Sequence, residues 1–176
     1  MKKIWWMILP LVLTGCTSMK CCAKPMATAT LAGTAPDSHI TGTVKLSETA
    51  HGLRMVVRVQ HMPPGTHGFH IHENGSCDDM GKAAGGHYNP AGVKHGYLPK
   101  DGLTAAHAGD FGNISVGHDG TGRRVVTMPG LTLTSGKYPV VGKAFILHAK
   151  ADDLTSQPTG NAGDRIACGV IVASGQ

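Results

Sequence analysis

The stretch ITGTVKL, residues 40–46, alternates apolar or small residues with threonine and lysine. A period of two residues is typical of a β-strand that buries one face. Similar patterns or short apolar runs recur in the segments 53–59, 68–72, 110–116, 123–128, 143–148 and 165–172. Turn signals such as Asp119-Gly120 separate them. We therefore expect an all-β fold, a sandwich or a barrel.

The composition supports one turn-rich β domain in a chain of 176 residues. Glycine (25) and proline (10) are frequent, whereas aromatic residues make up only 5%. The net charge of +5 is modest, and no dense run of lysine and arginine predicts a nucleic-acid partner. Residues 73–105 and 149–164 lack a regular pattern. Two long loops in a compact domain indicate a function for them.

The N-terminus resembles an export signal. Lys2 and Lys3 precede an apolar run over residues 4–13, which is too short to span a bilayer but suits a secretory signal. The run ends in Leu-Thr-Gly-Cys at residues 13–16, which resembles the bacterial lipoprotein signal. We expect a signal peptide over 1–15 and lipidation of Cys16, so that the protein is anchored to a membrane. The alternative is an ordinary signal peptide with a chance cysteine.

The predicted location is the cell envelope. Thr17, where an aspartate is absent, favours the periplasmic side of the outer membrane. Residues 16–37 are rich in Ala, Thr, Met and Pro without an apolar period, which predicts a flexible tether after the lipidated cysteine. The folded domain is expected over residues 38–176.

Five cysteines are consistent with an oxidising compartment. Cys77 and Cys168 are the only two in the body of the chain, and we expect them to form a disulfide. Cys21 and Cys22 remain open: they can form a strained ring, cross-link to another chain, accept acyl groups or bind copper.

Histidines indicate metal sites. Six of the eleven fall between residues 67 and 110, together with Asp110. His70 and His72 stand two apart in an extended segment, so their side chains point to the same face. His148 ends another buried strand. Imidazole is a common ligand of transition metals, and a carboxylate among imidazoles suits zinc, so we expect more than one metal site.

Several segments resemble copper,zinc superoxide dismutases over residues 38–173. They are GFHIHE (68–73), GHYNP (86–90), HAGDFGN (107–113), KADDL (150–154) and GNAGDRIACGVI (160–171). The resemblance implies a Greek-key antiparallel β-sandwich or flattened barrel, immunoglobulin-like, whose two long loops frame an active channel.

The resemblance also implies the ligands of one copper and one zinc ion per subunit. The copper ligands would be His70, His72, His87 and His148. The zinc ligands would be His87, His95, His107 and Asp110, with His87 shared as an imidazolate. Asp152 would link a copper-ligand and a zinc-ligand histidine, and His67 would support the copper strand. The Cys77–Cys168 disulfide matches the family.

The implied activity is the dismutation of superoxide to O2 and H2O2 in antioxidant defence. Copper would exchange one electron with each superoxide, while zinc would be structural. His87 would return a proton to the departing peroxide, Arg165 would attract and orient the anion, and Thr159 would line the channel. The alternative function is a copper- or zinc-binding storage module without turnover. The resemblance leaves the oligomeric state open, a homodimer included.

Two features depart from the common pattern of the family. Residues 96–106 lengthen the spacing between His95 and His107, so a loop insertion separates two of the implied zinc ligands. The segment 154–158 lacks the acidic and lysine residues that assist steering in many relatives. Steering would then rest on Arg165, Lys150 and the overall charge, and we expect the rate to fall as ionic strength rises.

Overall fold

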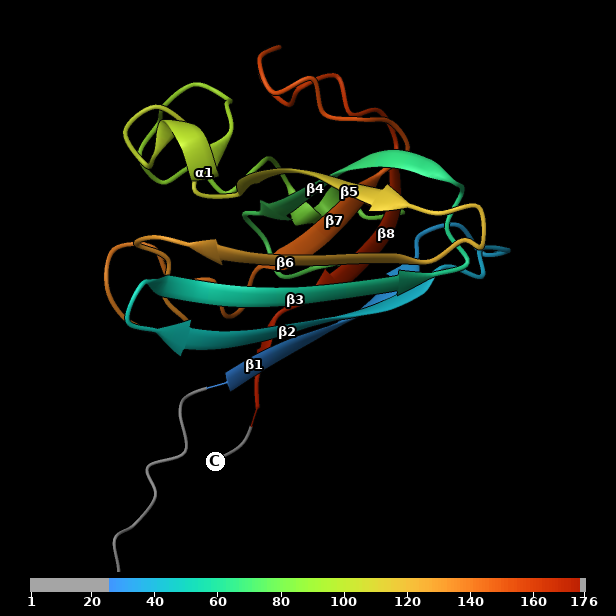
Figure 1. Ribbon diagram of the computed structural model, residues 1–176, viewed down its shortest axis with the longest axis horizontal. Helices are drawn as coiled ribbons and strands as arrows, with labels where there is room; N and C mark the ends of the chain where they lie inside the picture. The colour runs from blue at the N-terminus through green and yellow to red at the C-terminus, as the bar shows by residue number, and fades with distance from the viewer. Residues whose placement is uncertain (1–25, 175–176) are drawn as a thin grey trace, which may run out of the picture.

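The computed structural model describes residues 26–174, which contain nine strands and two short helices (Figure 1). The predicted signal peptide, Cys16, Cys21 and Cys22 lie outside these residues. The strands are β1 (Met26–Gly33), β2 (Thr41–Thr49), β3 (Gly52–Gln60), β4 (Gly65–His72), β5 (Asp110–Val116), β6 (Gly122–Met128), β7 (Ala144–His148), β8 (Arg165–Val170) and β9 (Val172–Ala173).

The strands form a closed, flattened antiparallel barrel. Their order is β2-β3-β6-β5-β4-β7-β8-β1-β9, and a pairing of β1 with β2 closes the circle. The connection from β3 to β4 passes over β6 and β5, which gives the Greek-key topology. The predicted all-β Greek-key barrel is confirmed.

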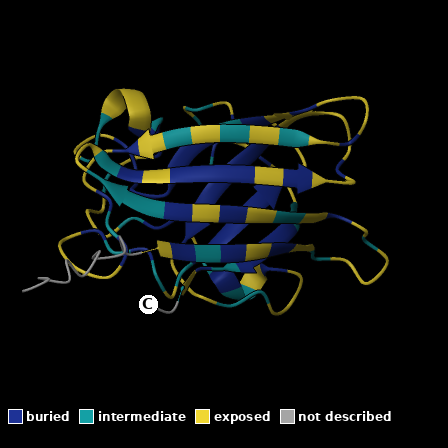
Figure 2. Cartoon of the chain, turned by 60° about the horizontal axis from the view of Figure 1, so that its bottom comes forward, coloured by how far each residue is buried: buried dark blue, intermediate teal, exposed yellow. Residues whose placement is uncertain are grey.

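One half of the barrel, formed by β1, β2, β3 and β6, alternates buried and exposed residues (Figure 2). In β2, Val44 and Leu46 are fully buried, whereas Thr43 and Lys45 are exposed. The alternation of residues 40–46 therefore predicts this half correctly, because one face meets the core and the other meets solvent.

The prediction of a flexible tether over residues 16–37 is wrong for its second half. Residues 26–33 form β1, which pairs with β2 from Met26 opposite Ser47 to Ala32 opposite Thr41. The side chains of Ala27, Ala29 and Leu31 point inward, and at most 1% of the surface of each residue is exposed. The domain therefore begins before residue 38. The alternation was missed because it is built mostly from alanine, whose small side chain gives a weak hydrophobic signal.

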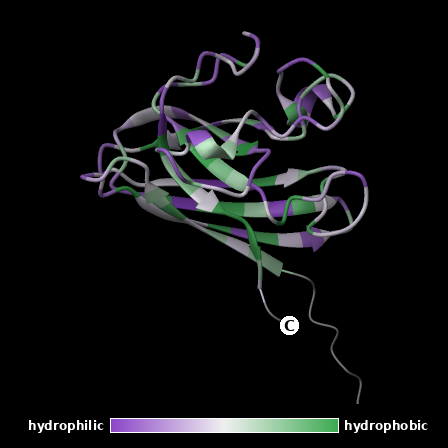
Figure 3. Ribbon diagram, turned by 180° about the vertical axis from the view of Figure 1, so that it is seen from behind, coloured by the Kyte–Doolittle hydropathy of each residue, from purple (hydrophilic) through white to green (hydrophobic). Residues whose placement is uncertain are grey.

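The other half, β5, β4, β7 and β8, is more deeply buried, and β4 and β7 are buried on both faces. All five residues of β7 are buried, as are the last six of β4. Phe69, Phe111 and Phe145 pack in the core, with the rings of Phe69 and Phe145 stacked 5.0 Å apart. The outer face is covered by the two long loops. Figure 3 shows that apolar residues lie mainly on the strands, whereas many hydrophilic residues lie in the loops.

The two loops connect β4 to β5 and β7 to β8. The first contains a short 3-10 helix, η1 (Lys82–Ala84), and a single-turn helix, α1 (Leu98–Asp101). The predicted disulfide is present: Cys77 in this loop is bonded to Cys168 in β8, 91 residues later, with 5.7 Å between their Cα atoms. Within residues 26–174, no helix has the length and apolar character needed to cross a membrane.

Candidate metal centre

Strand β4 presents two histidines on its outer face. Phe69 and Ile71 point into the core and are fully buried, so the alternation of the strand turns His70 and His72 the other way. These histidines are also buried, with 0% and 1% of their surface exposed. The loops that cover this face therefore form the second wall of the site.

Four histidines from three parts of the chain meet here. His70 and His72 come from β4, His87 from the first loop and His148 from the end of β7. One ring nitrogen of each lies within 4.8 Å of the others. These atoms are His70 Nδ1 and the Nε2 atoms of His72, His87 and His148, and all four are buried without a hydrogen-bond partner among the described residues.

Unpaired buried polar atoms are costly, so a convergent set of them indicates a missing ligand. The opposite nitrogen of each ring is held. His72 Nδ1 donates to the carbonyl of Gly85 at 3.0 Å, and His148 Nδ1 donates to that of Gly163 at 3.0 Å. Such contacts fix the tautomer, which leaves the unpaired nitrogen as an acceptor for a metal.

A second group of buried side chains lies next to the first. It consists of His87, His95, His107 and Asp110, whose ligand atoms are again within 4.8 Å of one another. The Nδ1 atoms of His87, His95 and His107 lie 2.7, 3.0 and 3.2 Å from the carboxylate of Asp110. The lengthened segment 96–106 therefore does not separate the predicted zinc ligands.

His87 belongs to both groups. Its Nδ1 faces Asp110 in the second group, whereas its Nε2 is one of the unpaired atoms of the first. Its ring lies 4.1 Å from that of His70 between centroids and 5.4 Å from that of His95. One imidazole can thus contact two metal ions, one through each nitrogen.

Asp152 connects the two groups from behind. Its Oδ2 lies 2.8 Å from His70 Nε2, and its Oδ1 lies 2.9 Å from His95 Nε2. Gly160 covers this carboxylate with a φ of +67°, and a Cβ there would overlap both Asp152 and His95. The second loop therefore needs glycine at this position.

The first group is neutral at physiological pH. Burial lowers the pKa of His70 to about 3, although the hydrogen bond that His70 donates to Asp152 acts in the opposite direction. Burial likewise lowers the pKa of His148 to about 4, and the pKa values of His72 and His87 are also lowered by burial. Neutral imidazoles are the form that binds metal, so this group needs no deprotonation near pH 7.

The second group is more polar. Burial alone would lower the pKa of His95, but its hydrogen bonds with Asp110 and Asp152 raise it to about 9. Burial would raise the pKa of Asp110, yet hydrogen bonds from His107, His87 and His95 hold it far below its usual value. An ionised carboxylate among three imidazoles suits zinc.

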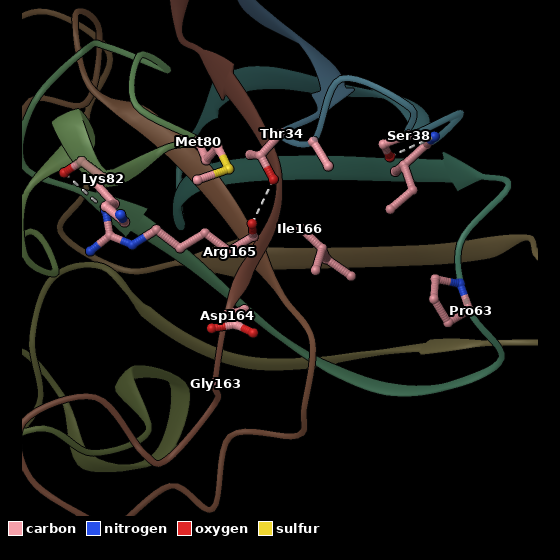
Figure 4. Close-up of a pocket in the computed structure, with 11 residues that line it drawn as sticks. Thr34, Ser38, Pro63, Met80, Lys82, Gly163, Asp164, Arg165 and Ile166 are labelled. Carbon is pink, nitrogen blue, oxygen red and sulfur yellow. Dashed lines mark hydrogen bonds between the residues drawn. The ribbon is translucent and has the colours of Figure 1, made fainter.

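Arg165 is held rigidly near the first group. Its guanidinium donates to the carbonyls of Gly81 and Gly85 at 2.6 Å each, and to that of Lys82 at 3.3 Å. Its positive charge helps to lower the pKa values of His72 and His148. Figure 4 shows the side chain extending toward Lys82 at the edge of an open cavity of about 650 Å³.

Two further predicted residues, His67 and Thr159, do not belong to either group of ligands. His67 is buried, and its ring nitrogens lie 2.9 Å from the carbonyls of His148 and Pro63, so it connects β4 to the end of β7. Thr159 is half-buried in the second loop, and its place in the channel stays a prediction.

Sequence reasoning missed two side-chain amides that hold the loops. Asn113 of β5 pairs with both backbone groups of Asp152, at 2.7 and 2.9 Å. Gln157 of the second loop pairs in the same way with His95, at 2.8 and 3.0 Å. Asn113 lies within the segment HAGDFGN, which provides a signal for it, whereas nothing in the sequence marks Gln157.

Comparison with known proteins agrees with this geometry. The crystal structure of the clock protein EA4 is similar, with a TM-score of 0.74 and 34% sequence identity over 85% of this chain and 96% of that chain. The family model described as copper/zinc superoxide dismutase matches residues 40–171, which contain both histidine groups, Asp152, Arg165 and the disulfide. The chain therefore belongs to the copper/zinc superoxide dismutase family.

Proposed function

We propose that the protein is an enzyme that dismutates superoxide: two superoxide anions and two protons give one O2 and one H2O2. The observation that carries the proposal is the convergence of four buried, unpaired imidazole nitrogens beside a second group that shares His87. A purely structural domain would leave these atoms without a partner.

The donor atoms fit the two metals. Four neutral imidazole nitrogens suit copper, which supplies one-electron oxidation and reduction when bound. Three imidazoles and the carboxylate of Asp110 suit zinc, which has no redox chemistry and would hold the first loop in place. His70, His72, His87 and His148 would hold copper, and His87, His95, His107 and Asp110 would hold zinc.

The side chains divide the remaining work. Arg165 offers a fixed positive charge to the superoxide anion, because its clamp by three carbonyls prevents it from turning away. His87 can hold a proton at Nε2 while Asp110 orients its Nδ1 at 2.7 Å, and that proton is available to the peroxide that leaves. Asp152 fixes the position of the first group relative to the second, because its carboxylate contacts His70 of one and His95 of the other.

The test compares the purified, metal-loaded protein with a His148→Ala variant. We measure copper and zinc per chain and the rate of superoxide loss by pulse radiolysis. The proposal expects one copper and one zinc in the wild type, and loss of copper and activity in the variant with zinc retained.

His118→Ala, at an exposed turn, is the matched control and should behave as the wild type. Equal activity in His148→Ala would refute the copper assignment. Copper bound by the wild type without turnover would support a storage module instead.

We also propose that the protein is lipid-anchored at Cys16 in the bacterial cell envelope. The support is the apolar run over residues 4–13 followed by Leu-Thr-Gly-Cys. Growth with a labelled fatty acid should label the wild type but not Cys16→Ser. Equal labelling of both would contradict the anchor.

A further inference from the structure

The solvent-facing side of the half-barrel formed by β1, β2, β3 and β6 carries an unusual charge distribution. Four exposed cations project from it, namely Lys45 on β2, Arg54 and Arg58 on β3, and Arg123 on β6. We call these four residues the basic face. None of them forms an ion pair within residues 26–174.

No carboxylate shares the outward positions of these strands. Residues 26–174 contain 12 lysines and arginines and 11 aspartates and glutamates, so the domain as a whole is nearly neutral. Glu48 is the only acidic residue on the four strands. It lies on the inward side of β2, where its Oε1 accepts a hydrogen bond from the backbone of Leu133 at 2.8 Å. The concentration of cations on this side is therefore local.

Two of the cations are directly opposed. Arg58 is the register partner of Arg123 across β3 and β6. Like charges in this position repel each other and destabilise a sheet, so the pair has no benefit for folding alone. A bound anion would remove the repulsion.

The surface is hollowed on both sides of this pair. One hollow of about 300 Å³ is lined by Met26, Lys45, Arg54 and others, and a second of about 340 Å³ is lined by Thr43, Gln60 and others. Arg58 and Arg123 line both hollows. Guanidinium groups bind phosphate oxygens in two-point contacts, and each hollow is wide enough for a phosphate group.

Exposed apolar residues accompany the charges. Met26 and Val125 are 46% and 41% exposed, and Val125 is paired with Val56 at the centre of the face. A surface that combines cations with a few apolar side chains suits a lipid interface, where headgroup phosphates and acyl chains meet.

The proposed anchor is close in sequence to the first strand of this face. Cys16 precedes Met26 by ten residues, which span at most roughly 35 Å when extended. Lys20 and Lys24 lie between them, and no carboxylate does. A basic surface close to a lipid anchor adds electrostatic attraction to anionic headgroups.

We infer that the basic face lies on a bilayer that contains anionic phospholipid. The metal centre is carried by β4, β7 and the two long loops, on the other half of the barrel (Figure 1). Seating this face on the membrane therefore turns the metal centre toward the aqueous phase. The inference does not depend on dismutase activity.

The test uses residues 16–176 with Cys16→Ser, Cys21→Ser and Cys22→Ser, a chain that contains every described strand and has no cysteine left before them to carry an acyl group. The metal-loaded protein is mixed with vesicles of phosphatidylcholine alone or of equal parts phosphatidylcholine and phosphatidylglycerol, and its partitioning is measured by flotation. We expect binding only to the anionic vesicles, and a decrease as salt is raised.

The double variant Arg58→Gln/Arg123→Gln should reduce partitioning about 30-fold, since each cation near such a surface contributes roughly a factor of five. Arg58→Lys/Arg123→Lys should retain most of the binding, which separates charge from a folding defect. Lys100→Gln/Lys137→Gln removes the same charge elsewhere and should leave binding within twofold of the wild type.

Four results would overturn the inference. They are equal binding to both kinds of vesicle, unchanged binding in the Arg58→Gln/Arg123→Gln variant, and an equal loss in the Lys100→Gln/Lys137→Gln control. The fourth is that the protein binds heparin or duplex DNA more tightly than the vesicles, or associates with itself, and that Arg58→Gln/Arg123→Gln weakens this binding and not the binding to vesicles. That result would assign the face to another polyanion or to a second copy of the chain.

Discussion

At the scale of single residues, the metal centre depends on the atoms behind the ligands as much as on the ligands. Each histidine of the first group, His70, His72, His87 and His148, uses one ring nitrogen for a contact that fixes its ring, and the other nitrogen has no hydrogen-bond partner among the described residues. Asp152 differs from the carbonyl partners because it contacts both groups, through His70 and His95. Its loss should therefore affect both metals.

For Asp152→Asn we expect the affinity for zinc and for copper to fall by about 10–100-fold each, because an outer carboxylate orients its imidazoles and raises their basicity. Competition with chelators of known affinity measures both constants. Asp37→Asn, an exposed carboxylate in the turn after β1, serves as the control. An unchanged copper affinity in Asp152→Asn would show that the two groups are independent.

Asp153, next in the chain, predicts a pH effect. Hydrogen bonds from Ser156, Thr155 and Asn161 lower the pKa of this exposed carboxyl to about 2. A pKa lowered by folding contributes stability that is present above the unfolded value near 4 and is lost as pH falls toward 2. The free energy of unfolding of the metal-free protein should therefore fall less steeply over this window in Asp153→Asn than in the wild type.

Unfolding by urea at a series of pH values provides the measurement, with Asp37→Asn as the control for charge. Parallel pH profiles for wild type and Asp153→Asn would contradict the prediction.

At the scale of elements, two amide side chains fasten the irregular loops to the metal groups. Asn113 holds the backbone of Asp152, and Gln157 holds that of His95. Each clamp makes two hydrogen bonds and so resembles a pair in a sheet ladder. The lengthened first loop is thus fixed to the second loop at His95, one of the proposed zinc ligands.

We expect Gln157→Ala to weaken zinc binding by up to about 30-fold and to leave copper affinity nearly unchanged, because two hydrogen bonds of about 1 kcal/mol each are lost beside His95 alone. Zinc titration against a chromogenic chelator tests this. Gln60→Ala, at the exposed end of β3, is the matched control. Equal weakening of both metals would indicate a general loosening of the loops.

At the scale of the whole molecule, the disulfide joins the loop that holds Arg165 to the barrel. Cys77 lies four residues before Gly81, the first of the carbonyls that clamp the guanidinium, and Cys168 lies in β8 with Arg165 itself. The disulfide therefore links the stability of the fold to the position of Arg165, the charge that we propose attracts superoxide.

Replacing both cysteines by serine should lower the free energy of unfolding by about 4–5 kcal/mol, the value of the chain-entropy model for a loop of this size. Denaturant unfolding measures it. Hydrogen exchange at Gly85 and neighbouring amides should also accelerate, since the loop loses its tie. A change below 1 kcal/mol would show that packing alone holds the loop.

The charge distribution predicts the salt dependence of the reaction. Residues 26–174 are nearly neutral, so attraction of superoxide rests on local charge such as that of Arg165. The rate should fall as ionic strength rises, and this slope should be shallower in Arg165→Gln than in Arg165→Lys. Stopped-flow rates over a salt series test this, and a flat response in the wild type would refute steering.

The sequence by itself determined the chemistry of the centre and most strands. His-x-His in an extended segment, His-x-x-Asp at the start of another and the alternation of residues 40–46 are local patterns, and local spacing sets which side chains share a face. It could not reveal β1, whose buried alanines carry little hydrophobic signal, or the clamp by Gln157, 62 residues from His95.

Only the tertiary structure decided how distant residues meet. The shared position of His87, the bridge made by Asp152 and the basic face all depend on strands and loops far apart in the chain. Lys45, Arg58 and Arg123 lie far apart in the sequence and become one surface through the register of three strands. Register follows from the burial of the opposite face, and that is a property of the assembled barrel.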